Sequence, residues 1–283
     1  MGSLSGSFSV VTPNFNMAGY LAETIESVLE NLEPLDDYFI IDGGSTDGSV
    51  EIIRSYEKYL SGWISEPDRG YADALSKGFA RSRGEFQCWI NSGDLLLKGT
   101  LKEARKRLKD TGADMIFGDD LYIDEQGFVI SHSTGNVKSL REMMLYGGWT
   151  PLQDACYWRK SLYDLVGGLN TEMKYAADYE LFLKMSCFGR CLYVPAIFSA
   201  FRRHSEQKSL TGSSLYKTER NSSRLKLMKE TGVSLAARLF WNTVYFGAVH
   251  WRSRVSCRLH KSSVHRGANV SQLSVLKLDG ERC

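Results

Sequence analysis

The chain has 283 residues, of which 43% are hydrophobic, 12% aromatic and 24% charged. These proportions exclude a disordered or fibrous protein and suit a globular chain with one large core or two smaller ones. The net charge of +2 hides two segments of opposite sign: residues 1–220 hold 24 Lys and Arg against 30 Asp and Glu, and residues 221–283 hold 11 against 3. A basic C-terminal segment favours an anionic partner.

Targeting and redox signals are absent from the sequence. No apolar run reaches the roughly 18 residues that span a bilayer, and the first residues contain neither a signal-peptide core nor a myristoylation pattern. The six cysteines contain no Cys-x-x-Cys pair and are expected to be reduced thiols in a cytosolic protein. They are Cys88, Cys156, Cys187, Cys191, Cys257 and Cys283.

Short β-rich runs alternate with helical patterns over the first hundred residues, which is typical of a mostly parallel sheet covered by helices. The expected strands are residues 8–12, 38–41, 63–65 and 85–90. The expected helices begin at Ala18, with Asn16 as N-cap, and cover residues 50–60 and 72–82.

The second half of the chain is less regular. It is predicted to contain a helix over residues 101–109, a strand over 114–117, a Gly/Asp-rich turn at 118–120, a strand over 192–200 and a helix with a cationic face over 215–229. No internal repeat or long linker is visible before residue 205.

Acidic side chains follow the predicted strands of the first half. Asp42, Asp47, Asp68 and Asp94 lie at or just beyond the ends of these strands. Ligands of open α/β sheets bind outside the carboxyl ends of the strands. Carboxylates with almost no histidine suit an oxygen-ligated divalent cation and phosphate better than zinc or nucleophilic hydrolysis.

Several common motifs are missing. The Gly-rich turn at 43–48 is no dinucleotide fingerprint, because that pattern directly follows the first strand, where Pro13-Asn14-Phe15-Asn16 lies. A Walker A loop, Gly-x-Ser-x-Gly and His-Glu-x-x-His are also absent. These absences argue against nicotinamide-dependent chemistry and against the hydrolases that carry those motifs.

A series of motifs resembles, in order and spacing, the landmarks of glycosyltransferase family 2. They are Ser9-Val10-Val11-Thr12-Pro13-Asn14-Phe15-Asn16, Ile41-Asp42-Gly43-Gly44-Ser45-Thr46-Asp47-Gly48, Ser65-Glu66-Pro67-Asp68-Arg69-Gly70, Gly84-Glu85 with Trp89-Ile90-Asn91-Ser92-Gly93-Asp94, Val166-Gly167-Gly168-Leu169, Ala177-Asp178-Tyr179-Glu180 and Phe201-Arg202-Arg203-His204. The resemblance covers residues 8–210. It implies a glycosyltransferase A fold, that is, an α/β fold with a mostly parallel central sheet flanked by helices. It also implies a nucleotide-sugar donor, Mg²⁺ or Mn²⁺, and inversion at the anomeric carbon.

The resemblance implies roles for individual residues on the donor side. Asp42 would accept a hydrogen bond from the base N–H, although Asp-Gly also commonly forms turns. Asp94 and His204 would be metal ligands. Here the metal element reads Ser92-Gly93-Asp94, so Asp94 is its one acid. The remaining nucleoside and diphosphate contacts would be Thr12, Pro13, Asn14, Arg69, Asp73, Ser92, Gly93 and Arg203.

Asp178 is the expected catalytic residue. In an inverting transfer a general base on the acceptor side removes the proton of the attacking hydroxyl. The family places this base in an acid-Asp pair that leads into a helix, and here the pair is Ala177-Asp178. The alternative for Asp178 is a helix N-cap. The acceptor would contact Trp149, Gln153, Asp154 and Asp120.

The sequence predicts three regions: a catalytic domain over 1–210, a basic aromatic helical extension over 211–260 and a disordered tail over 261–283. Residues 238–258 combine Trp, Tyr and Arg over too short a length to span a bilayer, so we expect them to bind an anionic membrane surface. Packing on the catalytic domain or on a second subunit is the alternative. No nucleic-acid-binding signature accompanies the charge.

These observations lead us to expect a cytoplasmic, metal-dependent, inverting hexosyltransferase, peripheral at the inner face of the membrane. It would move a sugar from a nucleoside diphosphate, with uracil the favoured base, to a glycan acceptor that is lipid-linked, in polysaccharide biosynthesis. Two alternatives stay open, namely a nucleotidyltransferase of nucleotide-sugar synthesis and a non-catalytic sugar-binding scaffold. The first needs a Gly-rich basic loop after the first strand, and the second would have lost Asp42, Asp94 and Asp178. A homo-oligomer is left open.

Overall fold

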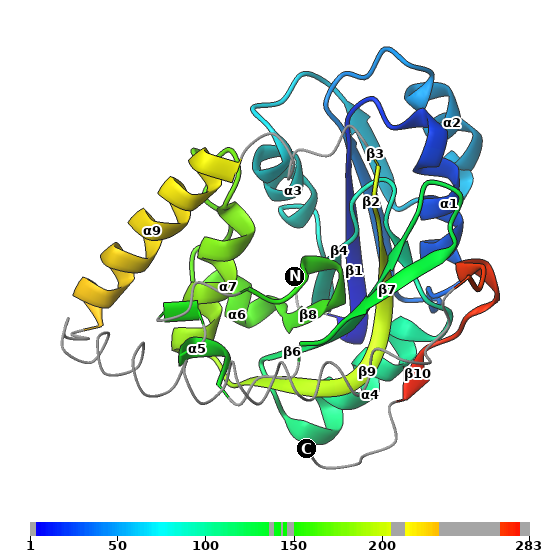
Figure 1. The fold of residues 1–283 in the computed structure, drawn as a ribbon. Coiled ribbons are helices and arrows are strands. Elements are labelled where there is room, and N and C mark those ends of the chain that lie inside the picture. Colours follow the sequence, from blue (N-terminus) through cyan, green and yellow to red (C-terminus); the bar gives the residue numbers. More distant parts are fainter. Residues whose placement is uncertain are drawn as a thin grey trace.

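The computed structural model describes residues 4–135, 139–142, 144–145, 150–204, 213–231 and 267–277. Within these residues a ten-stranded sheet lies between two layers of helices (Figure 1). The strands are β1 (Leu4–Asn14), β2 (Asp37–Asp42), β3 (Gly62–Ser65), β4 (Gly84–Trp89), β5 (Leu95–Leu96), β6 (Met115–Ile123), β7 (Val129–Ser133), β8 (Cys156–Arg159), β9 (Cys191–Arg202) and β10 (Leu276–Lys277).

The described helices cover both faces of this sheet. They are α1 (Ala18–Leu29), α2 (Ser49–Tyr56), α3 (Tyr71–Phe79), α4 (Thr100–Thr111), α5 (Leu140–Glu142), α6 (Lys160–Leu165), α7 (Ala177–Phe188) and α9 (Ser213–Glu230), with short 3-10 helices η1 (Glu57–Tyr59), η3 (Gln153–Ala155) and η5 (Val270–Gln272). None of the helices in the described ranges is both long and apolar enough to cross a membrane.

The sheet has a parallel half and a mixed half. Its strand order is β10-β9-β6-β8-β4-β1-β2-β3, and β4, β1, β2 and β3 are mutually parallel. Beyond β4, strand β8 is antiparallel to both β4 and β6, whereas β6 and β9 are parallel. Four parallel strands therefore end at the same edge of the sheet, as the sequence pattern predicts.

The side chains of each strand alternate between the two faces of the sheet, so each face has its own hydrophobic core. In β1, Phe8 and Val10 pack with α1, α2 and α4, whereas Val11 faces the opposite core with α3, α6 and α7. All three side chains are fully buried. Because successive strand residues point to opposite faces, the continuous apolar run of β1 is what a strand covered on both sides requires.

Two local predictions are wrong. Asn16 does not cap α1: it has φ +52° and its Oδ1 accepts from Thr46 N–H at 2.9 Å, while Asp47 Oδ2 accepts from Ala18 N–H at 2.8 Å. The N-terminal N–H of α1 is thus satisfied from the loop after β2. The turn predicted at residues 118–120 is also wrong, since β6 continues through it to Ile123 with shifted pairing to β9.

The C-terminal residues of the described chain return to the sheet. Strand β10 pairs antiparallel with β9, Leu276 opposite Ile197, and Val270 of η5 is 5% exposed in a small core beneath β6 and β7. The prediction of disorder is therefore wrong for residues 267–277, because their few apolar side chains find partners far away in the sequence. Residues 238–258 lie outside the described residues.

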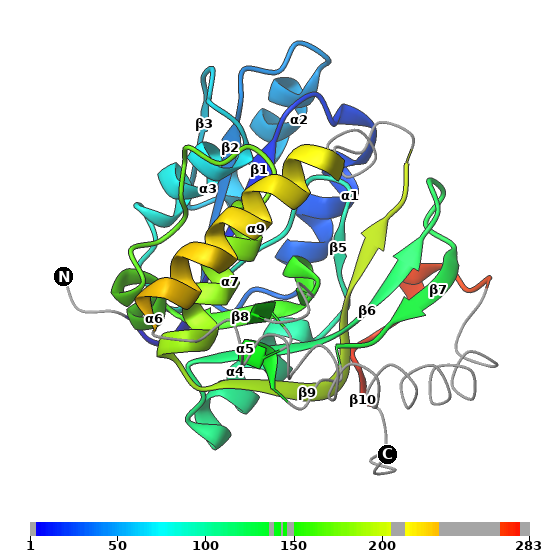
Figure 2. The ribbon, with the colours of Figure 1, turned by 60° about the vertical axis from the view of Figure 1, so that its left-hand side comes forward.

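Helix α9 follows the predicted cationic helix almost residue for residue, and it packs along α7 (Figure 2). Its Arg224 is buried and donates through Nε to the carbonyl oxygen of Leu145 at 3.0 Å. This helix therefore packs on the outside of α7, which itself belongs to the core on one face of the sheet.

Candidate active site

Asn14 joins the ends of three parallel strands. Its Nδ2 donates to Asp42 Oδ1 at 2.6 Å, and its Oδ1 accepts from the Ser92 hydroxyl at 2.8 Å. Ser92 Oγ is also 3.1 Å from the carbonyl oxygen of Pro13, and Thr12 is buried in the same strand end. The structure thus brings these five predicted residues together at one edge of the sheet.

Asp42 organises the loop that follows β2. Its Oδ2 accepts from the backbone N–H groups of Gly44 (3.1 Å) and Ser45 (2.9 Å) and from the Ser65 hydroxyl (2.6 Å), while Oδ1 accepts from Asn14 and from the Ser45 hydroxyl. Burial alone would raise the pKa of Asp42, but these hydrogen bonds together lower it below its usual value. Asp42 is 0% exposed, and every donor named here belongs to the protein.

Arg69 and Asp73 meet at the N-terminus of α3. The Arg69 guanidinium, 64% exposed, lies 3.1 Å from Asp73 and 3.4 Å from Glu172, and Lys77 lies 3.4 Å from Asp73. Burial tends to raise the pKa of Asp73, but the contacts with Arg69 and Lys77 lower it overall. An exposed guanidinium of this kind can exchange a carboxylate partner for a phosphate.

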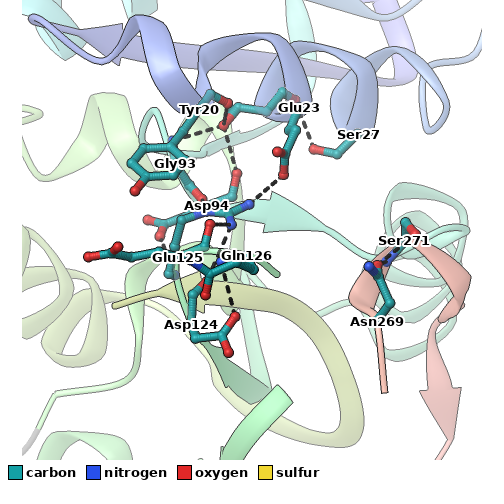
Figure 3. Close-up of polar contacts among 12 residues, drawn as sticks. Tyr20, Glu23, Ser27, Gly93, Asp94, Asp124, Glu125, Gln126, Asn269 and Ser271 are labelled. Carbon is teal, nitrogen blue, oxygen red and sulfur yellow. Dashed lines mark hydrogen bonds and ion pairs between the residues drawn. The ribbon is translucent and has the colours of Figure 1, made fainter. Parts of the chain in front are cut away.

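The turn that carries Asp94 is anchored by Arg202 of β9. The backbone N–H of Arg202 donates to Asp94 Oδ1 at 3.0 Å, and its Nε donates to the carbonyl oxygen of Gly93 at 2.9 Å. The same guanidinium contacts Glu23 of α1 at 2.5 Å and the carbonyl oxygen of Glu125 at 2.8 Å. Figure 3 shows Glu23, Asp94 and Glu125 converging from these separate segments. The position of Asp94 is therefore set by long-range contacts.

Gly93 and Thr24 complete this anchor. Gly93 has φ +107°, a conformation that glycine adopts without strain. Its N–H donates to Thr24 Oγ1 at 2.9 Å, and the Thr24 hydroxyl donates to the carbonyl oxygen of Asp94 at 2.9 Å. Gly93 therefore supplies the positive φ and a backbone hydrogen bond that this turn needs.

Three buried acids lie near one another behind this turn. Asp94 is 6% exposed, Asp120 0% and Asp154 1%. Within the described ranges, no hydrogen bond reaches either carboxylate oxygen of Asp120 or Asp154. Burial raises the pKa of all three, that of Asp154 to about 6, and the charge of Asp154 further raises those of Asp94 and Asp120. The buried Ser199 hydroxyl lies beside Asp120 and Asp154 and limits the rise of their pKa. This region therefore favours a proton or a cation.

The donor chemistry of this edge suits a divalent cation only in part. Carboxylate oxygens at Asp94 suit Mg²⁺ or Mn²⁺, and excess negative charge nearby favours a cation. Over the part of the chain that the structure describes, however, no three His, Cys, Asp or Glu side chains are arranged to hold a metal ion. These residues fit a cation held by one or two side chains together with ligand phosphates, and do not fit one held by the protein alone.

Arg203 and His204 follow Arg202 at the end of β9, on the same edge as Asp94. Arg203 is exposed, and its guanidinium lies 4.1 Å from the centre of the Tyr122 ring. His204 is partly buried, with its ring 5.7 Å from that of Tyr20. Both lie on segments that border the strand ends, as a ligand contact requires.

Asp178 is the second residue of α7. Helices α7 and α1 pack against opposite faces of the sheet. Asp178 is half-buried, and burial of its carboxyl group raises its pKa to about 6. Tyr71 of α3 accepts from the backbone N–H groups of Ala177 (2.9 Å) and Asp178 (3.3 Å) and donates to Asp178 Oδ1 at 3.5 Å. Tyr179 N–H donates to the same Oδ1 at 2.7 Å, and among the described residues no hydrogen bond to Oδ2 is found. The geometry combines a helix N-terminus with a carboxylate that is protonated more readily than usual.

The predicted acceptor residues lie near a cavity of about 120 Å³. Its lining is Gly118, Tyr122, Ser133, Thr134, Gly135, Thr150 and Leu152. Gln153 and Asp154 follow directly in η3, and Asp120 lies in β6 two residues before Tyr122. Trp149 lies outside the described residues.

The sequence reasoning missed Arg202, Thr24 and Tyr71. Arg202 lies inside a family motif, beside the predicted Arg203, and Tyr71 directly follows the motif that ends at Gly70, two residues before the predicted Asp73. Nothing local distinguishes Thr24 from an ordinary helix residue, because its partners are about 70 residues away.

Together, the fold and these strand ends define an α/β protein with a ligand site at the carboxyl edge of its parallel strands. Residues 9–163 match the family described as Glycosyl transferase family 2, which is more than half of the chain. The chain therefore belongs to glycosyltransferase family 2, and the predicted family is confirmed.

Among its relatives is TuaG of Bacillus subtilis (strain 168), described as a teichuronic acid biosynthesis glycosyltransferase, which is 33% identical over 98 residues. That match covers 34% of this chain and 39% of TuaG, so the chain spans well under half of that relative's length.

Two solved structures have a similar fold. S. aureus TarS 1–349 with UDP-GlcNAc matches 71% of this chain and 60% of its own, at 19% identity and TM-score 0.58. The mannosyltransferase PcManGT of Pyrobaculum calidifontis with GDP-Man and Mn²⁺ matches 89% of this chain and 83% of its own, at 17% identity and TM-score 0.54. These likenesses confirm the predicted α/β fold of the glycosyltransferase A type.

Proposed function

We propose that this protein transfers a sugar from a nucleoside diphosphate to a hydroxyl of a glycan acceptor, with inversion at the anomeric carbon. The observation that carries the proposal is the placement of Asp178, a half-buried residue at the start of α7, whose Oδ1 is held by Tyr71 and Tyr179 and whose pKa burial raises to about 6. Family membership supplies the class of reaction.

In the proposed mechanism Asp178 is the general base. Its Oδ2 takes the proton of the acceptor hydroxyl while the acceptor oxygen bonds to the anomeric carbon. The bond from that carbon to the diphosphate oxygen breaks, and its electron pair leaves with the nucleoside diphosphate. A base with a pKa near 6 is largely ionised at neutral pH and is a stronger base than an ordinary Asp. Tyr71 and Tyr179 hold Oδ1, so that Oδ2 is oriented by the protein.

Cationic groups would stabilise the charge that develops on the departing diphosphate. Arg203 and Arg69 are exposed guanidinium groups at the edge and would contact phosphate oxygens. Asp94 and His204 would hold Mg²⁺ or Mn²⁺, which supplies Lewis-acid stabilisation of the leaving group when bound. The PcManGT complex with GDP-Man and Mn²⁺ supports metal use in this fold.

We propose a UDP-sugar as donor and a lipid-linked glycan as acceptor, in polysaccharide biosynthesis. The complex of TarS with UDP-GlcNAc supports the choice of donor, and the description of TuaG supports polysaccharide biosynthesis. Thr12, Pro13, Asn14 and Asp42 would contact the nucleoside.

We further propose a peripheral association of residues 238–258 with anionic lipid at the inner membrane face. Co-sedimentation with anionic vesicles of the full chain and of a full-length variant in which Arg252, Arg254 and Arg258 are replaced by Ser tests this association. Equal binding of the two would contradict it.

A thermal-shift panel of UDP, dTDP and GDP, with and without Mn²⁺, tests the proposed function. We expect UDP to raise the Tm in the presence of Mn²⁺, because a ligand that binds only the folded state stabilises it. The control is Asp178→Asn, which should keep this shift while losing turnover. The proposal fails if no nucleotide changes the Tm in the presence of metal.

A further inference from the structure

Helix α7 begins without a side-chain cap of its own. Its N-cap residue is Ala176, and no side-chain hydrogen bond caps the helix from that position. The first N–H groups of a helix have no partner inside the helix, so they need acceptors from elsewhere. Those of Ala177 and Asp178 reach the hydroxyl of Tyr71 in α3. The three residues before them find a different partner.

Glu219 of α9 accepts from three consecutive backbone N–H groups. Lys174 N–H donates to its Oε1 at 3.0 Å, and the N–H groups of Tyr175 and Ala176 donate to its Oε2, each at 2.9 Å. Glu219 is partly exposed, so this carboxylate is not simply filling a core. A carboxylate at a helix N-terminus also interacts favourably with the helix dipole.

We propose that Glu219 is a positioning residue for Asp178: its carboxylate holds the backbone that leads into α7 and thereby sets the place of the catalytic carboxylate against the acceptor. This inference rests on the proposed function of Asp178. It assigns α9, which lies beyond the residues that match the family, a part in the active site.

Geometry and charge act together at this contact. Holding residues 174–176 fixes the direction in which α7 starts, and a displacement of about 1 Å at a reacting group can lower the rate up to 100-fold. The negative charge of Glu219 also opposes ionisation of Asp178. The other titratable groups that interact electrostatically with Asp178 are Tyr71 of α3, Tyr216 of α9 and Cys156 of β8.

Three variants of the full chain test the proposal: Glu219→Ala, Glu219→Gln and the matched control Glu230→Ala. Glu230 lies on the same helix, carries the same charge and is exposed. The first measurement is hydrogen exchange of the peptide that spans residues 172–180. We expect faster exchange in Glu219→Ala and unchanged exchange in Glu230→Ala.

The second measurement is turnover of the nucleotide sugar as a function of pH. Glu219→Ala should lower kcat on the order of 10-fold to 100-fold, with little change in the KM of the donor, because the donor residues lie on other strand ends. Glu219→Gln removes the charge and keeps one acceptor oxygen, so the acid limb of its pH profile should move to lower pH. Glu230→Ala should behave as wild type in both respects.

The outcomes separate this inference from the proposed function. A wild-type protein that turns over no nucleotide sugar overturns the proposed function, while the exchange measurement still reports on Glu219. Unchanged exchange in Glu219→Ala overturns the positioning role whatever the activity. Faster exchange with unaltered kcat and pH profile also overturns it, because Glu219 would then cap α7 without affecting Asp178.

Discussion

The environment of Asp178 makes its protonation state the most informative property of the site. Burial, the largest influence, raises the pKa to about 6, while the N–H of Tyr179 and the hydroxyl of Tyr71 limit the rise. A raised pKa means that the folded state resists ionising this carboxyl. Its contribution to stability is present below the pKa of the unfolded chain and is lost as pH rises through about 6. The same group therefore costs stability at the pH where the proposed function needs it ionised.

Replacing this carboxylate should separate activity from binding and stability. We expect kcat/KM of the wild type to rise about tenfold per pH unit up to pH near 6 and then to level off, because only the ionised base accepts the proton. Asp178→Asn should lower turnover by about 10²-fold to 10⁴-fold. At pH 7.5 it should also raise the Tm, since an amide carries no ionisation cost. Steady-state kinetics across pH and thermal melts measure these effects, and an Asp178→Asn variant with normal turnover would contradict the role.

Arg202 is the residue whose removal should cost the most stability near the site. Its side chain is fully buried and pairs with Glu23 and with the carbonyl oxygens of Gly93 and Glu125. Arg202→Met removes these hydrogen bonds to its charged group, at about 1.5–3 kcal/mol each in buried sites, and leaves the carbonyl of the buried Gly93 unpaired, so we expect a loss of about 2–4 kcal/mol in the free energy of unfolding. Urea denaturation measures it. The neighbouring exposed Arg203 supplies the control, because Arg203→Met should change stability by less than about 0.5 kcal/mol.

At the scale of elements, helix α3 shows how closely the helices approach the sheet. A Cβ added at Gly78 would lie 2.4 Å from Cγ1 of the buried Val11 in β1. Glycine normally weakens a helix interior by about 1 kcal/mol relative to alanine. Here the close approach to β1 outweighs that preference, and it brings Tyr71 and Asp73 of the same helix to the strand ends.

This close packing predicts opposite effects for two chemically identical substitutions. Gly78→Ala should lower the free energy of unfolding by about 1–3 kcal/mol, because β1 has no room to yield. Gly19→Ala in α1, where an added Cβ has no atom within 4 Å, should raise it by up to about 1 kcal/mol. Chemical denaturation of both variants measures the contrast, and a stabilising Gly78→Ala would show that α3 can move away from the sheet.

At the scale of the whole molecule, the described C-terminal segment closes one edge of the fold. The N–H of Val129 in β7 donates to the carbonyl oxygen of Ala268 at 3.0 Å, and that of Val270 donates to the carbonyl oxygen of Gly127 at 3.0 Å. Strand β10 continues this pairing along β9. The segment thus connects the basic part of the sequence to the acidic body.

The contribution of this closure can be measured at Val270. Val270→Ala should reduce the free energy of unfolding by about 1–2 kcal/mol, the value of two buried carbon atoms. Gln272→Ala, at an exposed position of the same 3-10 helix, should leave it unchanged. Equal denaturation midpoints for Val270→Ala and wild type would show that residues 267–277 add nothing to the stability of the body.

The sequence alone was sufficient for the class of fold, the family and most of the parallel half. Strand periodicity and the polar residues that follow each strand are local properties, so they predict that Asp42, Asp47, Asp68 and Asp94 share an edge. Helix limits such as those of α9 follow from spacing in the same way. The individual roles of these residues remain predictions.

Only the tertiary structure decided which distant groups form hydrogen bonds with the polar groups at this edge. Arg202 reaches Asp94 across 108 positions, Glu219 reaches Ala176 across 43, and Asp47 displaces Asn16 as the cap of α1. Such partners cannot be inferred from spacing, because a buried N–H or carboxylate accepts whichever group the packing of helices and strands brings within about 3 Å. The near-neutral net charge likewise gives no sign that Asp94, Asp120 and Asp154 are buried near one another behind this edge.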